Sequence, residues 1–334
     1  MVYRDRIYGE IEIEEPIILE LINSSVLQRL KEIDQAGYPP LYYNPRSLPT
    51  SEIAHNRFEH SMGVYYLLKR FGASIEEQIS GLIHDVSHTA FSHCIDYVLD
   101  SGSEKEHNHQ DKIFKNFVER SEIPEILRKY NFNPDYISDE HNFPLLEKFL
   151  PDLCADRIDY SLRTAIYLRE LTGQELDYLL DNLTTENNQW VFKNFESAKK
   201  YAELFFKLNT FYYAGIYSAV MFRTVGDTLR YALEKGYISE NDLYTTDKEV
   251  LDKIKQCLEK DEKLKLFFDR MNNKIKFEDN PADYEAHVFC KSRIVDPSFK
   301  TDGEIKRISE VDNDWKKILE KEMQPKEYFI KFER

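Results

Sequence analysis

The sequence contains few cysteines, and their spacing forms no known motif. The four cysteines, Cys94, Cys154, Cys257 and Cys290, lie far apart and include no CxxC pair. Disulfide frameworks and thiolate zinc sites both need cysteines at regular or close spacing. The sequence therefore disfavours both, and a reducing cytoplasm is the compartment that we expect.

Long apolar runs are also absent. No segment approaches the roughly 20 apolar residues that span a bilayer. The first ten residues, MVYRDRIYGE, are charged from the start, whereas a secretory signal would place an apolar stretch there. We therefore expect no signal peptide and no membrane partner.

Glycine and proline are scarce, with 11 and 12 among 334 residues. Helix formers such as Leu, Glu and Lys are common, and 42% of the residues are hydrophobic and 31% charged. These proportions are typical of a globular protein and favour a mainly helical fold.

Positive charge is in deficit, because 45 Lys and Arg face 60 Asp and Glu, for a net charge of −15. Binding to a nucleic-acid backbone needs clustered Lys and Arg, so a nucleic-acid partner is disfavoured. A small phosphorylated substrate remains compatible with this charge. One metal ion and a few arginines are enough to make a positive pocket in an acidic protein.

The first half of the chain is dominated by helical periodicity. Residues 6–15 alternate Ile with polar residues and predict a short hairpin. Helical patterns follow at 16–37, at 60–99 and, broken near Pro151, at 142–170. The stretch YPPLYYNPRSLPTSEIA between the first two is a proline-punctuated loop.

The second half mixes both kinds of pattern. Residues 189–194 are strand-like, and 196–236 form a long helical stretch with an expected break near Gly215. Residues 275–299 carry further strand signals. Without repeats or a low-complexity linker, the two halves are expected to form one continuous body.

Candidate metal ligands are concentrated in GLIHDVSHTAFSHCID, residues 81–96, which holds three of the nine histidines. Neighbouring helical residues point about 100° apart, so His84 and Asp85 can reach one ion only near a helix end. With His60 and the remote Asp156 they form a mixed nitrogen and oxygen set that suits Mn, Fe, Zn or Mg. We predict a divalent metal ion on these four residues. The alternative is that the His-Asp pair is a surface pair or a helix cap.

His88 and His93 follow the metal-ligand pair at short spacing. His88 lies four residues after His84, and Asp96 lies three after His93, which would let its carboxylate hold that ring in one tautomer. The functional interpretation is a general acid or base beside the metal. The alternative for each histidine alone is a helix cap or a hydrogen-bonded core residue.

Several segments together resemble the deoxynucleoside triphosphate triphosphohydrolase branch of the HD-domain phosphohydrolases, which includes the SAM-and-HD-domain enzyme. They are RDRIYGEIEI, LQRLKEIDQAG, HNRFEHSMGVYYL, GLIHDVSHTAFSH, DRIDYSLR and KSRIVDP, in that order. The resemblance covers most of residues 5–170 and returns near 290–297. It implies a mainly α fold: a helical HD-type core over residues 1–184, with short N-terminal strands, and a smaller helical and α+β region over 185–334 packed on it.

The resemblance also implies residue roles. Residues expected to be catalytic or to contact phosphate beside the metal are His88, His93, Asp96 and His109. Residues expected to bind substrate are Arg57 and Arg157, at the phosphate oxygens, Gln35 and Tyr160, on the sugar side, and Tyr217. His107 is the alternative to His109 as the further active-site histidine, with a preference for His109, which is followed by Gln110.

One departure from the family concerns the residues that bind the phosphates. In family members, a His and a Lys follow the tyrosine at the Tyr217 position, whereas AGIYSAVMFRTVGDTL has neither. Thr164 also stands where family members often place an Asp near the sugar. We therefore expect weaker selectivity for triphosphates, unless Arg223 or Lys207 compensates.

The sequence thus predicts metal-dependent hydrolysis of phosphoester or phosphoanhydride bonds in nucleotides, with deoxynucleoside triphosphates as the leading case. A phosphatase acting on nucleoside monophosphates or other small phosphoesters is one alternative, and a non-catalytic nucleotide sensor is another. The retained ligands and histidines argue against the sensor. We also expect a homo-oligomer.

Overall fold

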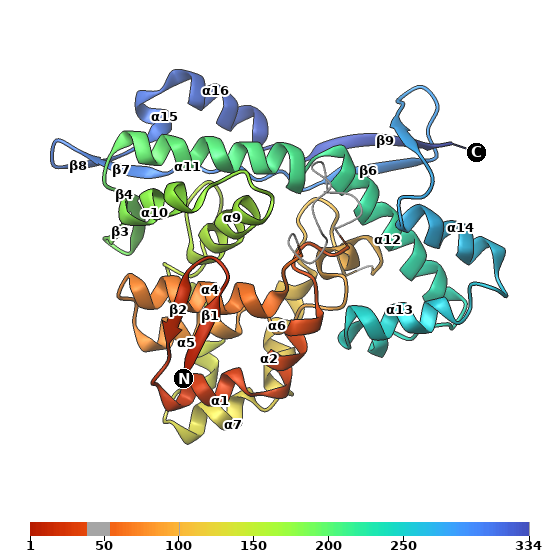
Figure 1. The fold of residues 1–334 in the computed structure, drawn as a ribbon, viewed down its shortest axis with the longest axis horizontal. Helices are drawn as coiled ribbons and strands as arrows, with labels where there is room; N and C mark the ends of the chain where they lie inside the picture. Colours follow the sequence, from red (N-terminus) through yellow and green to blue (C-terminus); the bar gives the residue numbers. More distant parts are fainter. Residues whose placement is uncertain (39–53, 100, 334) are drawn as a thin grey trace.

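The structure, a computed structural model, describes residues 1–38, 54–99 and 101–333. Most of the predicted proline-punctuated loop lies outside these residues. The chain begins with a hairpin in which β1 (Val2–Asp5) pairs antiparallel with β2 (Gly9–Glu12). A hairpin was predicted here, but it lies nearer the N-terminus than the predicted residues 6–15, and its first strand precedes them. This hairpin lies against the helical body of the first half of the chain (Figure 1).

Short helices build the rest of the first half. They are α1 (Pro16–Ile22), α2 (Ser25–Arg29), α4 (Arg57–Arg70), α5 (Ile75–Ile83), α6 (His109–Glu119), α7 (Ile123–Lys129), α8 (Pro134–Ile137), α9 (Ala155–Tyr167) and α10 (Gly173–Asp181), with 3₁₀ turns η1 (Leu30–Glu32), η2 (Ser92–Tyr97) and η3 (Glu140–Asn142). The single helical pattern predicted from His60 to Leu99 is therefore two α-helices and a 3₁₀ turn.

Local sequence explains where the helices that carry the site begin and end. At the start of α4, the Asn56 side chain accepts from the Glu59 backbone N–H at 2.9 Å, and Glu59 accepts from the Asn56 N–H at 3.2 Å. Ser74 caps α5 by accepting from the Glu77 N–H at 3.2 Å. Because α5 ends at Ile83 with His84 at its C-cap, His84 and Asp85 stand at a helix end, as predicted.

The second half adds helices and two small sheets. Its elements are β3 (Leu183–Glu186), β4 (Gln189–Phe192), α11 (Phe195–Leu208), the π-turn η4 (Asn209–Tyr213), α12 (Ile216–Glu234), η5 (Glu240–Tyr244), α13 (Asp247–Lys255), α14 (Glu262–Met271), β5 (Phe277–Asp279), β6 (Ala286–Cys290), β7 (Ser298–Thr301), β8 (Glu304–Arg307), α15 (Ile308–Val311), α16 (Asn313–Glu322) and β9 (Lys326–Phe332). One sheet has the order β3-β4-β7-β8 and the other β5-β9-β6. The predicted break at Gly215 separates α11 from α12 and is confirmed.

The hydrophobic core crosses the predicted boundary at residue 184. One cluster of buried residues joins Ile11 and Ile83 from the first half to Phe205 and Trp315 from the second. Figure 1 shows α11 passing along α9 and α10, which brings the two halves together. The predicted mainly α fold with α+β additions is confirmed, whereas the division at residue 184 stays a prediction.

Two further features of the described residues bear on function. None of their helices has the length and apolar character needed to cross a membrane.

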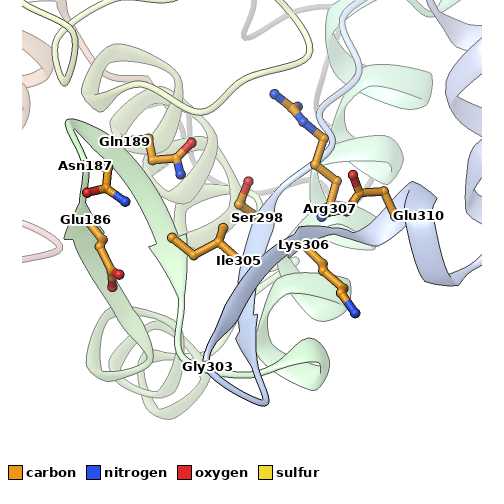
Figure 2. Close-up of a pocket in the computed structure, with 9 residues that line it drawn as sticks. All are labelled: Glu186, Asn187, Gln189, Ser298, Gly303, Ile305, Lys306, Arg307 and Glu310. Atoms are coloured by element: carbon orange, nitrogen blue, oxygen red, sulfur yellow. Dashed lines mark hydrogen bonds between the residues drawn. The ribbon is translucent and has the colours of Figure 1, made fainter.

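A polar cavity of about 370 Å³ opens on the β3-β4-β7-β8 sheet (Figure 2). It is lined by Glu186, Asn187, Gln189, Ser298, Gly303, Ile305, Lys306, Arg307 and Glu310. No predicted site residue is among them.

Candidate metal centre

Three of the predicted metal ligands converge on one point. His60 comes from α4, His84 from the end of α5, and Asp156 from the first turn of α9. His60 Nε2 lies 2.8 Å from Asp156 Oδ1 and 3.2 Å from His84 Nε2, and His84 Nε2 lies 3.5 Å from Asp156 Oδ1. Ligands bound at about 2 Å from one transition-metal ion lie about 3–3.5 Å apart, so this spacing fits a metal site.

Asp85, the fourth predicted ligand, lies at the edge of this group. Its carboxylate oxygens are 3.5 Å from His84 Nε2 and 3.8 Å from His60 Nε2. Burial opposes its ionisation, but the charge of Arg57, 2.7 Å away, and of the neighbouring histidines holds the pKa of Asp85 well below its usual range. Asp85 is therefore an anionic group beside the other three, and its role as a ligand stays a prediction.

The electrostatics of the cluster favour a cation. Burial alone would lower the pKa of His84, but Asp85 and Asp156 outweigh it and raise that pKa to about 9. His60 behaves in the same way, since hydrogen bonds to Asp156 and Asp159 outweigh its burial and raise its pKa. The carboxylates therefore create a field that attracts positive charge to the point where the Nε2 atoms meet.

Both imidazoles are fixed through their other nitrogen. His84 Nδ1 lies 2.7 Å from the Gly81 carbonyl oxygen, and His60 Nδ1 lies 2.7 Å from Asp159 Oδ2. A partner of this kind fixes the tautomer and directs the Nε2 lone pair at the metal position. The residues present therefore fit a divalent metal ion, and His60, His84, Asp85 and Asp156 would hold it.

Asp159 belongs to a fully buried ion cluster that the sequence analysis missed. The Arg163 guanidinium donates to both oxygens of Asp159 at 3.0 Å and to Asp5 Oδ2 at 3.0 Å, and all three side chains are fully buried. The segment DRIDYSLR contains the signal, because Asp159 follows Asp156 by three residues and precedes Arg163 by four. The cluster links the N-terminal hairpin to the ring of His60.

Gly63 makes room for this cluster, and replacing it with alanine should damage the metal centre. A Cβ there would lie 1.9 Å from Asp159 Oδ1 and 2.3 Å from Arg163 Nη2. Overpacking of this kind typically costs about 1–3 kcal/mol. Gly63→Ala should lower the unfolding temperature and weaken metal retention, as followed by calorimetry and elemental analysis.

Gly173→Ala is the matched control for that substitution. Gly173 is the first residue of α10 and, like Gly63, has no positive φ, but a Cβ there meets no atom within 4 Å. Stability should stay the same or rise slightly, since alanine forms helices better than glycine. Equal metal content and stability in both variants would contradict the proposed contact between position 63 and the cluster.

The two predicted catalytic histidines lie beside the metal ligands. His88 Nε2 is 3.2 Å from Asp85 Oδ1, and the rings of His88 and His93 stand 5.1 Å apart. Burial, followed by the charge of Arg57, lowers the pKa of His88 to about 4, and burial lowers that of His93 well below its usual range. Both imidazoles are therefore neutral near pH 7 and each has a nitrogen that can accept a proton.

The further histidine beside this pair is His107. Its ring stacks on His93 with centroids 5.2 Å apart, and its Nε2 lies 3.1 Å from Tyr97 Oη. The preferred candidate, His109, instead contacts Ser101 Oγ at 2.9 Å and Tyr244 Oη at 3.4 Å. The geometry thus favours the alternative, and a catalytic role for His109 stays a prediction.

Asp96 contacts the backbone of the segment that carries His107 and His109. Its Oδ1 accepts from the His109 backbone N–H at 3.0 Å and from that of Ser103 at 3.3 Å. Its Oδ2 lies 3.6 Å from His93 Nδ1. Both of these facing atoms are buried and have no hydrogen-bond partner among the described residues. The spacing thus brings Asp96 close to His93 without a hydrogen bond between them, and the role of Asp96 in orienting that ring stays a prediction.

The two predicted phosphate-binding arginines are engaged with the protein. Arg57 donates to Asp85, to Ser92 Oγ at 3.0 Å and to the Gln35 carbonyl at 2.9 Å. Arg157 donates to the carbonyls of Asp152 and Lys148 and to Glu147 Oε1. Both guanidinium groups are buried, and their contact with phosphate stays a prediction.

The predicted substrate-side residues differ in position. Tyr160 lies over His60 with ring centroids 6.4 Å apart, and Gln35 lies beside Arg57 with its Oε1 buried and unpartnered within the described ranges. Tyr217 on α12 is 49% exposed and packs edge-on against Phe277. The structure therefore places Tyr160 near His60 and Gln35 beside Arg57, and the roles of all three residues in binding substrate stay predictions.

Comparison with known proteins agrees with this geometry. The model of the HD domain matches residues 57–163, which carry all four predicted metal ligands. The uncharacterized protein YdhJ of Bacillus subtilis is 34% identical over 89% of this chain and 88% of its own length. A phosphohydrolase structure from Bacteroides thetaiotaomicron superimposes with a TM-score of 0.72 at 18% identity, covering 100% of both chains.

Two relatives with named activities match part of the chain. The metal-dependent phosphohydrolase cns2 of Cordyceps militaris is 36% identical over 54% of this chain and 49% of its own length. The deoxynucleoside triphosphate triphosphohydrolase SAMHD1 of Mus musculus is 30% identical over 40% of this chain and 22% of its own length.

Proposed function

The chain belongs to the HD-domain family of metal-dependent phosphohydrolases, and on that basis we propose that it hydrolyses nucleotides, with deoxynucleoside triphosphates as the leading substrates. The observation that carries the proposal is the convergence of His60, His84 and Asp156 beside two neutral histidines. The similarity to SAMHD1 over 40% of the chain supports the choice of substrate.

Different residues of the chain would have different roles in hydrolysis. A divalent metal ion, when bound, supplies a polarised phosphoryl oxygen and an activated water. Asp159 and Gly81 keep the two ligand histidines oriented. The neutral imidazoles of His88 and His93 would take a proton from a nucleophile and pass it to a leaving oxygen, and Asp96 would orient His93. Tyr160 offers an aromatic face beside His60.

Hydrolysis of a nucleotide panel tests the proposal. The metal-loaded protein is incubated with the mono-, di- and triphosphates of the four deoxynucleosides, and the products are identified by chromatography. Inorganic tripolyphosphate as product supports the proposal, and its loss with a chelator supports the metal requirement. Inorganic phosphate released from monophosphates alone would replace the proposal with the small-phosphoester phosphatase, and no turnover of any nucleotide would contradict both.

His93 and His88 should contribute to turnover and not to metal binding. Replacing either with alanine should keep metal content, and at least one variant should lose about 100- to 10,000-fold in kcat, the usual contribution of general acid or base catalysis. Metal analysis and steady-state kinetics on the best nucleotide check this. Wild-type rates in both variants would refute it.

A further inference from the structure

Two cations in the loop between β6 and β7 have no carboxylate partner in the part of the chain that the structure describes. Lys291 and Arg293 are both half-buried. The Arg293 guanidinium reaches only the Lys291 carbonyl, at 3.4 Å, and the Lys291 ammonium makes no hydrogen bond to a described residue. They belong to the KSRIVDP segment, to which the sequence analysis gave no role.

The loop that carries them is held firmly. The side chain of Asn209, which is fully buried in η4, donates to Ser292 Oγ at 2.9 Å and accepts from the Arg293 backbone N–H at 2.8 Å. Ile294 and Val295 are fully buried behind it. The two charged side chains therefore start from a fixed backbone, which lowers the entropic cost of binding a ligand.

Contacts on both sides of this loop place it near the histidine cluster formed by His88, His93 and His107. Tyr97 Oη donates to the Phe289 carbonyl at 2.6 Å and lies 3.1 Å from Nε2 of His107, the ring that stacks on His93. Lys291 follows two residues after Phe289. On the other side, η4 carries Tyr213, whose ring stands 5.5 Å from that of Tyr160.

The positive charges of Lys291 and Arg293 also affect the pKa values of His93 and His107. Burial is the main cause of the lowered pKa of His93 and of His107, and the positive charges of Arg293 and Lys291 lower both further. The pKa of Lys291 itself is lowered to about 8, by burial and by the charge of Arg293. The charges of Asp111 and Glu147 oppose this lowering, but neither forms an ion pair with Lys291 among the described residues. An anionic ligand between the two cations would therefore relieve their repulsion.

We propose that Lys291 and Arg293 form a polyphosphate-binding site that holds the outer phosphate groups of the substrate beside the metal centre. The inference rests on the proposed function and names residues for its phosphate recognition. Other cations considered for this role have partners within the protein: Arg57 pairs with Asp85, Arg157 with Glu147, and Arg223 with Asp227 at 2.9 Å. A guanidinium and an ammonium are both good donors to phosphate oxygens.

The site also changes the expectation for selectivity. In family members a His and a Lys follow the tyrosine that corresponds to Tyr217, and this chain has neither. With Lys291 and Arg293 in their place, the triphosphate is bound more tightly than the monophosphate, because only the triphosphate extends to the outer phosphate positions.

Calorimetric titration with inorganic tripolyphosphate tests the site without requiring turnover. The full-length protein is titrated in buffer that holds Mg²⁺ in excess over the anion. Lys291→Gln/Arg293→Gln should weaken the Kd by about 10- to 100-fold, since each charge-assisted hydrogen bond is strong. Lys291→Arg/Arg293→Lys, which keeps both charges, should stay within a few-fold of the wild type.

The matched control removes two surface charges of the same kind. In Lys248→Gln/Lys317→Gln, both lysines are exposed and pair with neighbouring carboxylates at 2.7 and 3.0 Å. This variant should bind like the wild type, and thermal melting checks that every variant is folded. Unchanged binding by the Gln/Gln loop variant, equal weakening in the control, or no binding by the wild type would overturn the site.

The same experiment separates the inference from the proposed function. Wild-type protein that binds tripolyphosphate through Lys291 and Arg293 but hydrolyses no nucleotide would retain the anion site and refute the function. Protein that releases tripolyphosphate from deoxynucleotides with the same kcat/KM in the wild type and the Gln/Gln variant would retain the function and refute the site.

Discussion

Replacing His84 with alanine is expected to abolish metal retention and hydrolysis together. The imidazole is one of three groups, with His60 and Asp156, whose ligand atoms lie within 4.8 Å of one another. A bound metal contributes several kcal/mol to transition-state stabilisation, so the rate should fall by at least about a thousandfold. Elemental analysis of the purified variant and the nucleotide assay measure the two effects.

His84 is a cleaner test of the metal site than Asp85. The side chain of His84 is 15% exposed, and after its removal Asp85 keeps its pair with Arg57 and Asp156 keeps its contact with His60. Asp85→Ala, by contrast, would strand the buried guanidinium of Arg57. His84→Ala should therefore melt near the wild-type temperature, and Asp85→Ala should melt lower. A His84→Ala protein with full metal content would contradict the ligand assignment.

The main features of the site could be predicted because its chemistry is local in the sequence. His84 and Asp85 are adjacent, and a helix end is the one place where such neighbours can face a common point. The short spacing from His88 to Asp96 likewise places one carboxylate near His93, and the structure brings Asp96 Oδ2 to 3.6 Å from His93 Nδ1. The more distant His60 and Asp156 were included for their donor atoms, and the fold brings both to the same point as His84.

What could not be predicted depends on contacts between distant segments. His107 and His109 differ by two residues, and only the fold decides which ring stacks on His93. Arg57 and Arg157 stand beside metal-site motifs in the sequence, but nothing in the sequence says that carbonyls and carboxylates of the protein already occupy them. Lys291 comes near His107 through the fold, because Tyr97 bonds both to the Phe289 carbonyl at the end of β6 and to His107.

In the fold, too, features that depend on local sequence could be predicted, and features that depend on distant contacts could not. The break at Gly215 and the end of α5 follow from short-range signals and are confirmed, whereas the hairpin begins four residues before the predicted segment. The parallel pairing of β4 with β7 joins Val191 to Ser298, more than 100 residues later, and no local pattern specifies it. Long-range pairing of this kind is set by burial of the whole core and not by the propensity of either strand.

Replacing Arg163 with methionine is expected to be among the most destabilising single changes in the chain. Its guanidinium is fully buried and donates to Asp159 and Asp5, whose side chains are also fully buried. Burial opposes the ionisation of Asp159, and Arg163 is the first group that holds its pKa below the usual value. Leaving two carboxylates without their partner should cost about 3–5 kcal/mol in the free energy of unfolding, as measured by urea denaturation.

Two further variants separate this effect from a general loss of packing. In Arg163→Met/Asp5→Asn/Asp159→Asn the stranded charges are gone, so much of the lost stability should return, although His60 then has no charged partner at Nδ1 and metal retention should stay low. Arg4→Met breaks an exposed pair with Glu10 and should leave stability unchanged. If Arg163→Met were as stable as Arg4→Met, the buried cluster would have no part in holding His60 and the hairpin in place.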